Sequence, residues 1–308
     1  MAERWASARR VYERAENAAR LPLRKLCFEG PEDELRRTEN LQPCVVATSL
    51  AALAAALEEA GLPAARELDL WEVPVSPDFL AGHSVGEYSA LAGSGAIPFE
   101  ACMEIVTLRG GLMARAARSR PGSMLALLGG TLEGAERLCA DLRSTIAGSY
   151  VGVANVNSPE QFVIAGDLQS VAQAADRSAG YGFRRALPIA VAGAFHSVAM
   201  LPAAEELGRR LLASEIREPL IPVVGNMDAL PLGGTAAVRA ELSGQVAAPV
   251  RWADSIAYMI SRGVDRFVEV GPGEVLTRLI RRSAPDVEAT AAGDAAGVAE
   301  LARLLGGG

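Results

Sequence analysis

A five-residue segment, Gly82-His83-Ser84-Val85-Gly86, constrains the fold of this chain more than any other part of its sequence. A short apolar stretch at 78–81 precedes it, and a helix-forming stretch at 87–92 follows it. A serine between two glycines at a strand-to-helix turn is held in a tight, strained conformation that exposes its hydroxyl above the sheet. The bare pattern is common by chance. Together with the flanking strand and helix, it predicts a nucleophilic Ser84.

A serine hydroxyl is a weak nucleophile without a base, and histidine is the side chain best suited to that role near neutral pH. The chain has two histidines. The backbone direction at His83 points its side chain away from the neighbouring hydroxyl, which leaves His196 as the expected base. The apolar run 189–195 before it predicts a buried strand that ends in a loop, where open α/β sheets build their sites. The alternative is a structural histidine that caps a helix beginning near Val198.

Composition narrows the class of protein. A chain of 308 residues with 50% hydrophobic residues can bury a large core in one large domain or two unequal ones. Its net charge of -7 argues against a nucleic-acid-binding or membrane-binding surface, and the apolar run 45–57 is too short to span a membrane and predicts a core helix. The four cysteines and two histidines form no metal-ligand spacing, so we expect no metal and no cofactor. Without a signal peptide, the expected location is cytoplasmic.

Strands and helices alternate along the chain, which indicates an α/β fold with a mostly parallel sheet. Between 124 and 190 the order is strand, helix, strand, strand, helix, strand, which is typical of a ferredoxin-like unit. We therefore expect a small subdomain at 124–190 inserted into a larger domain made of 1–123 and 191–308, with the site in the cleft between them. The other predicted elements are helices within 4–61, at 98–117, from 196 to about 213 and at 235–242, and strands at 221–225 and, as the last strand, 266–270.

Seven segments taken together resemble one known family. They lie, in order, at 26–43, 82–91, 108–113, 154–166, 193–197, 245–252 and 267–276. These segments resemble the malonyl-CoA:acyl carrier protein transacylase family, which includes the acyltransferase domains of fatty acid and polyketide synthases. The resemblance covers nearly the whole chain. It implies an α/β-hydrolase-like larger domain that carries the ferredoxin-like subdomain.

The resemblance also implies a ping-pong mechanism. Ser84 would attack the thioester of malonyl-CoA, and the phosphopantetheine thiol of an acyl carrier protein would then take the malonyl group, with His196 as base and then acid in each half. A main-chain carbonyl near Gln245 would orient His196 in place of a carboxylate, and the N–H of Val85 would be one of two donors to the oxyanion. A surface glutamine before a loop is the alternative for Gln245.

Three residues form the substrate-binding set that the resemblance implies. Arg109 matches the family arginine that pairs with the malonyl carboxylate, and a planar guanidinium can hold a carboxylate through two parallel hydrogen bonds. Phe195, before the base, is similar to the malonyl-selecting branch and would crowd an α-methyl group. His83 completes the set. By itself, Arg109 would also fit a solvated position on a helix.

One part of the family pattern is missing. Members begin with a strand and a Gly-Gln-Gly-Ser-Gln loop that supplies the second oxyanion donor, and nothing similar precedes Trp5. A late start codon, a fragment or a member without catalysis would each explain this, and we expect the first because every later motif is intact.

Two rival functions stay open: an acyl-carrier-protein hydrolase that uses water in place of the thiol, and a catalytically impaired module that binds the carrier protein. The expected partners are malonyl-CoA and acyl carrier protein, and we expect a monomer. The pathway, fatty acid or polyketide synthesis, stays open.

Overall fold

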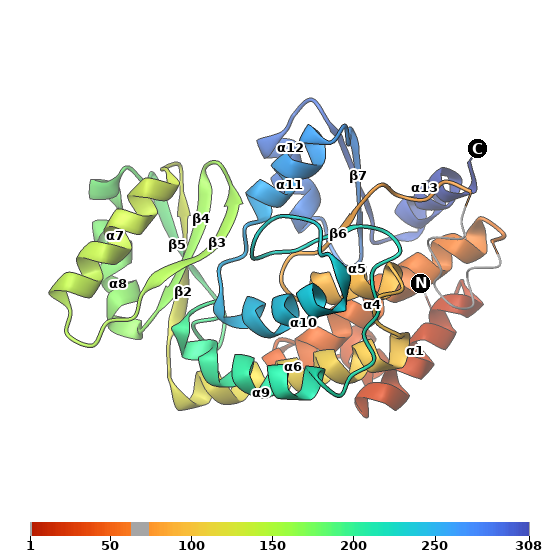
Figure 1. Ribbon diagram of the computed structural model, residues 1–308, viewed down its shortest axis with the longest axis horizontal. Helices are drawn as coiled ribbons and strands as arrows, with labels where there is room; N and C mark the ends of the chain where they lie inside the picture. The colour runs from red at the N-terminus through yellow and green to blue at the C-terminus, as the bar shows by residue number, and fades with distance from the viewer. Residues whose placement is uncertain (1, 63–73, 308) are drawn as a thin grey trace.

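The computed structural model describes residues 2–62 and 74–307, and it has the expected α/β fold, with helices around short parallel strands and a separate antiparallel sheet (Figure 1). The first part of the chain forms α1 (Ala6–Ala19), α2 (Leu23–Phe28), α3 (Glu32–Leu35), α4 (Thr38–Glu59), β1 (Leu80–Ala81), α5 (Gly86–Gly93) and α6 (Phe99–Ser119). The middle part forms β2 (Ser123–Leu128), α7 (Leu132–Thr145), β3 (Gly152–Ser158), β4 (Gln161–Gly166), α8 (Leu168–Arg177) and β5 (Arg185–Ile189). The last part forms α9 (Leu201–Leu211), β6 (Val223–Val224), α10 (Gly234–Gly244), α11 (Trp252–Ser261), β7 (Arg266–Val270), α12 (Val275–Ser283), β8 (Glu288–Ala292) and α13 (Ala295–Gly306).

The strands of the larger part are parallel, but they form two short sheets. Strand β1 pairs with β6, and β7 pairs with β8. The strands predicted at 78–81 and 221–225 are two residues long each. The prediction that 266–270 is the last strand was wrong, because β8 follows it. Three of the five residues of β8 are alanine, which gives a weak strand signal in the sequence, and its pairing with β7 holds it in place.

Helix α4 forms the centre of the main core. It has 22 residues, so it is longer than the apolar run 45–57 that predicted it, and by length and composition it could cross a membrane. However, 78% of its most apolar stretch is buried inside the protein. Residues of α1 and α6 are buried in the same core cluster. The burial, and not the length, identifies it as the core helix that the sequence predicts.

The antiparallel sheet has the strand order β3-β4-β2-β5, and its elements follow the predicted strand-helix-strand-strand-helix-strand order. Both faces of the sheet are covered. Leu125 and Leu127 of β2 pack into a small core with α7, whereas Met124 on the other face belongs to the main core. In Figure 1, α7 and α8 cover the outer face of this sheet, away from the rest of the molecule. The division into domains at 124 and 190 stays a prediction.

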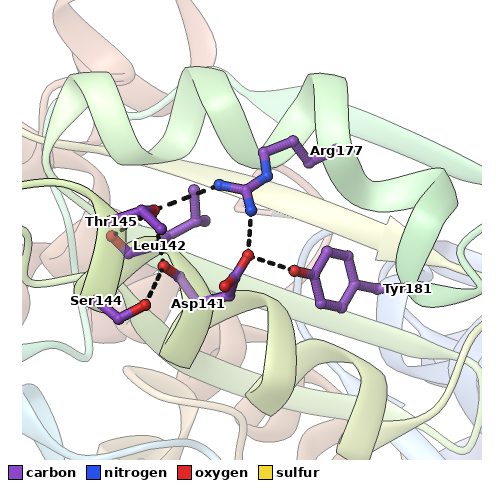
Figure 2. A network of polar contacts seen from close by, with 6 residues as sticks. All are labelled: Asp141, Leu142, Ser144, Thr145, Arg177 and Tyr181. Atoms are coloured by element: carbon purple, nitrogen blue, oxygen red, sulfur yellow. Dashed lines mark hydrogen bonds and ion pairs between the residues drawn. The ribbon is translucent and has the colours of Figure 1, made fainter.

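Polar contacts join helices α7 and α8 (Figure 2). Asp141 of α7 forms an ion pair with Arg177 of α8 and accepts a hydrogen bond of 2.5 Å from the hydroxyl of Tyr181. Half-exposed ion pairs contribute little free energy. The buried leucines of the small core, among them Leu138 and Leu142, therefore hold these helices on the antiparallel sheet, and the polar contacts align the helices.

The buried strand predicted over 189–195 was wrong. Strand β5 ends at Ile189, and Val191 beyond it is exposed. The pairing explains this: β5 is an edge strand whose only neighbour in the sheet is β2, and Met124 of β2, opposite Ile189, is the last residue of that ladder. Without a partner strand, the chain continues as a loop that leads back to the main core.

The turn around Ser84 depends on a close approach between two backbone segments. A Cβ at Gly82 would lie 2.0 Å from the carbonyl carbon of Gly86 and 2.3 Å from the backbone nitrogen of Glu87, whereas a Cβ at Gly86 would meet no atom within 4 Å. Only the first glycine of the motif is therefore required for steric reasons.

We expect Gly82→Ala to destabilise the protein by about 3 kcal/mol, the upper end of the usual cost of an overpacked site. Gly86→Ala, at the start of α5, should leave the stability unchanged or slightly increase it. The thermal unfolding of the two purified variants, compared with the parent, checks this. Equal melting temperatures for both variants would contradict the steric explanation.

Candidate active site

Ser84 lies in a left-handed backbone conformation, with φ 51°, between β1 and α5. Its backbone N–H donates to the side-chain oxygen of Asn226 at 2.7 Å, and the side-chain nitrogen of Asn226 donates to the carbonyl of Gly82 at 2.7 Å. The next residue, Val85, caps the N-terminus of α5, where the helix dipole favours negative charge. Asn226, which follows β6, thus holds the strained turn from the opposite side.

The hydroxyl of Ser84 donates a hydrogen bond to His196, whose Nε2 lies 2.8 Å from Ser84 Oγ. Its Nδ1 lies 2.9 Å from the carbonyl oxygen of Gln245 and 3.2 Å from that of Ala248. A carbonyl oxygen can only accept, so Nδ1 carries the proton and Nε2 is free to take one from serine. The structure thus brings Ser84, His196 and the main chain of Gln245 into one line of hydrogen bonds.

The pKa of His196 is lowered to about 3. Burial is the main cause, the charge of Arg109 lowers the pKa further, and the two carbonyl contacts act in the opposite direction. The free protein therefore holds His196 neutral throughout the physiological pH range, in the form that acts as a base.

Arg109 is 1% exposed, and its guanidinium points at the serine. One terminal nitrogen donates to the side-chain oxygen of Gln42 at 2.5 Å, and the other donates to Ser84 Oγ at 3.0 Å and to Gln245 Oε1 at 2.8 Å. All three acceptors are neutral, and within the described residues Arg109 forms no ion pair with a carboxylate. A buried cation that donates only to neutral acceptors, next to a serine hydroxyl, is suited to bind a negatively charged substrate group.

The side chain of Gln245 connects these groups. It is fully buried, its oxygen accepts from Arg109, and its nitrogen donates to the carbonyl of Ser84 at 3.0 Å and to the carboxyl of Glu87 at 2.9 Å. The alternative of a surface glutamine is therefore wrong, as is that of a solvated helix arginine at 109.

Two predicted residues lie farther from the hydroxyl. The Nε2 of His83 lies 2.8 Å from the side-chain oxygen of Asn157, and its ring packs against Trp252 with the centroids 5.7 Å apart. It therefore points away from the serine, as its backbone direction predicts. Phe195 is half-buried and packs against the main core directly before His196.

Sequence reasoning missed several residues that touch this network, among them Gln42, Glu87, Asn226 and Glu241. Gln42 and Glu87 lie inside segments that resemble the family, so their position in a shared segment was a signal. Asn226 and Glu241 lie outside those segments, and only the fold brings them to the serine.

Known proteins are similar to this chain over most of its length. The family described as the acyl transferase domain matches residues 4–303. The chain is 36% identical over 280 residues to the malonyl CoA-acyl carrier protein transacylase of Bacillus subtilis (strain 168), covering 91% of this chain and 83% of that protein. Its structure is similar to a crystal structure of an acyl carrier protein S-malonyltransferase from Vibrio cholerae, with a TM-score of 0.88 and 34% identity, covering 97% of this chain and 93% of that one. It is also similar to a malonyl-transacylase in complex with its type II PKS acyl-carrier protein, with a TM-score of 0.89 and 34% identity over 100% of this chain and 93% of that one.

The lowered pKa of His196 predicts how fast a serine-directed fluorophosphonate probe labels Ser84. Because His196 is neutral in the free protein down to a pH near its pKa of about 3, the labelling rate should stay constant between pH 8 and pH 5. A histidine with the ordinary pKa would lose about tenfold in rate for each pH unit well below 6.5. His196→Ala should lower the rate roughly a hundredfold or more at every pH. A decline centred near pH 6.5 would contradict the assigned environment.

Proposed function

This chain belongs to the acyl transferase domain family, and we propose that Ser84 carries the malonyl group in its reaction while His196 takes and returns the proton. The activity is that of an acyl carrier protein S-malonyltransferase, which moves malonyl from malonyl-CoA to the thiol of an acyl carrier protein. One observation supports the assignment above the others: Ser84 Oγ lies within hydrogen-bonding distance of both the base His196 and the buried cation Arg109.

In the first half of the reaction, the hydroxyl of Ser84 attacks the thioester carbon while its proton passes to Nε2 of His196. The carbonyl oxygen becomes negative, and the N–H of Val85, at the N-terminus of α5, stabilises it. The carbon–sulfur bond then breaks, and the CoA sulfur leaves with the proton from His196. The products are malonyl-Ser84 and free CoA.

The second half reverses these roles. The phosphopantetheine thiol of the carrier protein gives its proton to His196 and attacks the ester carbon of malonyl-Ser84. Val85 again stabilises the oxyanion. The serine oxygen leaves with the proton from His196, which restores the free site. The carbonyls of Gln245 and Ala248 support this exchange because they hold the ring in place and stabilise its protonated form.

Arg109 distinguishes malonyl from uncharged acyl groups in this proposal. The malonyl carboxylate replaces Ser84 Oγ as an acceptor of the guanidinium, while Gln42 and Gln245 hold the other hydrogen bonds and so fix its orientation. Phe195, next to the base, limits the space for a branched acyl group. His83 completes the wall of the site through its contacts with Asn157 and Trp252.

The acidic net charge of -7 favours a protein without a nucleic-acid or membrane partner. We expect a cytoplasmic monomer that meets malonyl-CoA and acyl carrier protein in turn, in either fatty acid or polyketide synthesis. The reaction as written needs no metal or other cofactor.

Arg109→Ala should raise KM for malonyl-CoA or lower kcat/KM by roughly 30-fold to several thousandfold, because about 2 to 5 kcal/mol of charge-paired binding is lost. Turnover of acetyl-CoA, which lacks the carboxylate, should change much less. Arg109→Lys keeps the charge but not the paired geometry and should recover only part of the loss. Steady-state transfer to a holo carrier protein, measured with both CoA esters, checks this.

Arg115→Ala is the matched control, because Arg115 is exposed on the same helix. It should leave both activities unchanged. An equal loss of malonyl and acetyl transfer in Arg109→Ala would contradict carboxylate recognition and indicate that Arg109 only supports the serine.

A further inference from the structure

Two buried carboxyl groups lie behind residues 82–86, the nucleophile turn. The proposed reaction does not use them. Glu87 of α5 is fully buried, and Glu241 of α10 is 5% exposed. Both accept a hydrogen bond from the same donor, the backbone N–H of Asn226, at 3.2 Å and 2.9 Å. Two acceptors of one N–H must lie close together, so the two glutamates form a pair.

The contacts of this pair end on residues that touch the serine. Glu241 also accepts from the backbone N–H of Met227 at 3.0 Å. It therefore holds the two successive backbone N–H groups of Asn226 and Met227. Glu87 also accepts from the side chain of Gln245, which donates to the carbonyl of Ser84. The pair thus anchors the two side chains that hold the nucleophile turn, one on the N–H of Ser84 and one on its carbonyl.

Charge decides the protonation of such a pair. Two carboxylates in one buried site repel each other, so one of them keeps its proton. Burial raises the pKa of Glu87 well above its usual range, and the neighbouring Glu241 raises it further, while Arg109 acts in the opposite direction. Burial also raises the pKa of Glu241.

The other titratable groups around the pair come from three elements. Arg109 of α6 interacts electrostatically with Glu87, Tyr88 is the next residue on α5, and Asp228, in the segment after β6, interacts electrostatically with Glu241. Burial raises the pKa of Tyr88 further above neutrality, so Arg109 and Asp228 are the charges that matter. A pair with one proton carries one negative charge, which offsets the single positive charge of buried Arg109.

We propose that Glu87 and Glu241 are positioning residues that share one proton and hold Asn226 and Gln245 against the nucleophile turn. This inference rests on the proposed role of Ser84. Because only one member is ionised, an amide at one of the two positions can replace the neutral carboxyl, whereas an apolar side chain removes the acceptor for the N–H groups of Asn226 and Met227.

Infrared spectroscopy tests the shared proton without any activity. The protein, labelled with carboxyl-13C glutamate, is measured at pH 8, where an exposed glutamate is ionised. We expect a band from one protonated glutamic acid side chain that is missing in the Glu87→Gln/Glu241→Gln variant and altered in each single variant. No protonated band in the parent, or a band that persists in the double variant, would overturn the proposal.

Kinetics test the positioning. The rate of Ser84 acylation by malonyl-CoA should fall roughly tenfold to a hundredfold in Glu241→Leu, with circular dichroism as the folding check, and should stay within about threefold of the parent in Glu241→Gln. Glu205→Gln, an exposed change on α9, is the matched control and should have no effect. A rate in Glu241→Gln as low as in Glu241→Leu would overturn the shared proton.

The two proposals fail in different ways. Absence of acylation in the folded parent would overturn the proposed role of Ser84 but leave the infrared result intact. A fully active Glu241→Leu in a folded protein would overturn the positioning role and leave the role of Ser84 intact.

Discussion

The arrangement of the site depends on Gln245, through its buried side chain and its backbone carbonyl. Its carbonyl accepts from His196, its side-chain oxygen accepts from Arg109, and its side-chain nitrogen donates to Ser84 and Glu87. One residue therefore sets the distances between His196, Arg109 and Ser84. Because the side chain of Gln245 is fully buried, a side chain that could not both donate and accept would leave polar groups without partners at a high cost in free energy.

Burial gives each charged or titratable group in this site a state that it would not hold in water. It keeps His196 neutral, so the base is ready before substrate arrives. It leaves Arg109 with only neutral acceptors, so an incoming carboxylate gains a strong, poorly screened partner. It also forces the two carboxyls behind the serine to share their charge. Burial thus preorganises the site as much as its geometry does.

The sequence predicts the local parts of this account and not the distant ones. The turn at Ser84 has its own signal, and His196 followed from the scarcity of histidine. Arg109 and Gln245 needed the resemblance to a family, because a lone arginine or glutamine carries no local pattern. Asn226 could not be predicted from the sequence, since 142 positions separate it from the serine to which it hydrogen-bonds. The alanine-rich strand β8 was missed because its pairing, and not its side chains, defines it.

The central claim is that Ser84 carries the malonyl group. Intact-protein mass spectrometry after brief incubation with malonyl-CoA tests it most directly, beside Ser84→Ala and a circular dichroism check of folding. The account predicts a gain of one malonyl mass in the parent and none in the variant. A folded parent without the gain, or a gain that persists in Ser84→Ala, would contradict it.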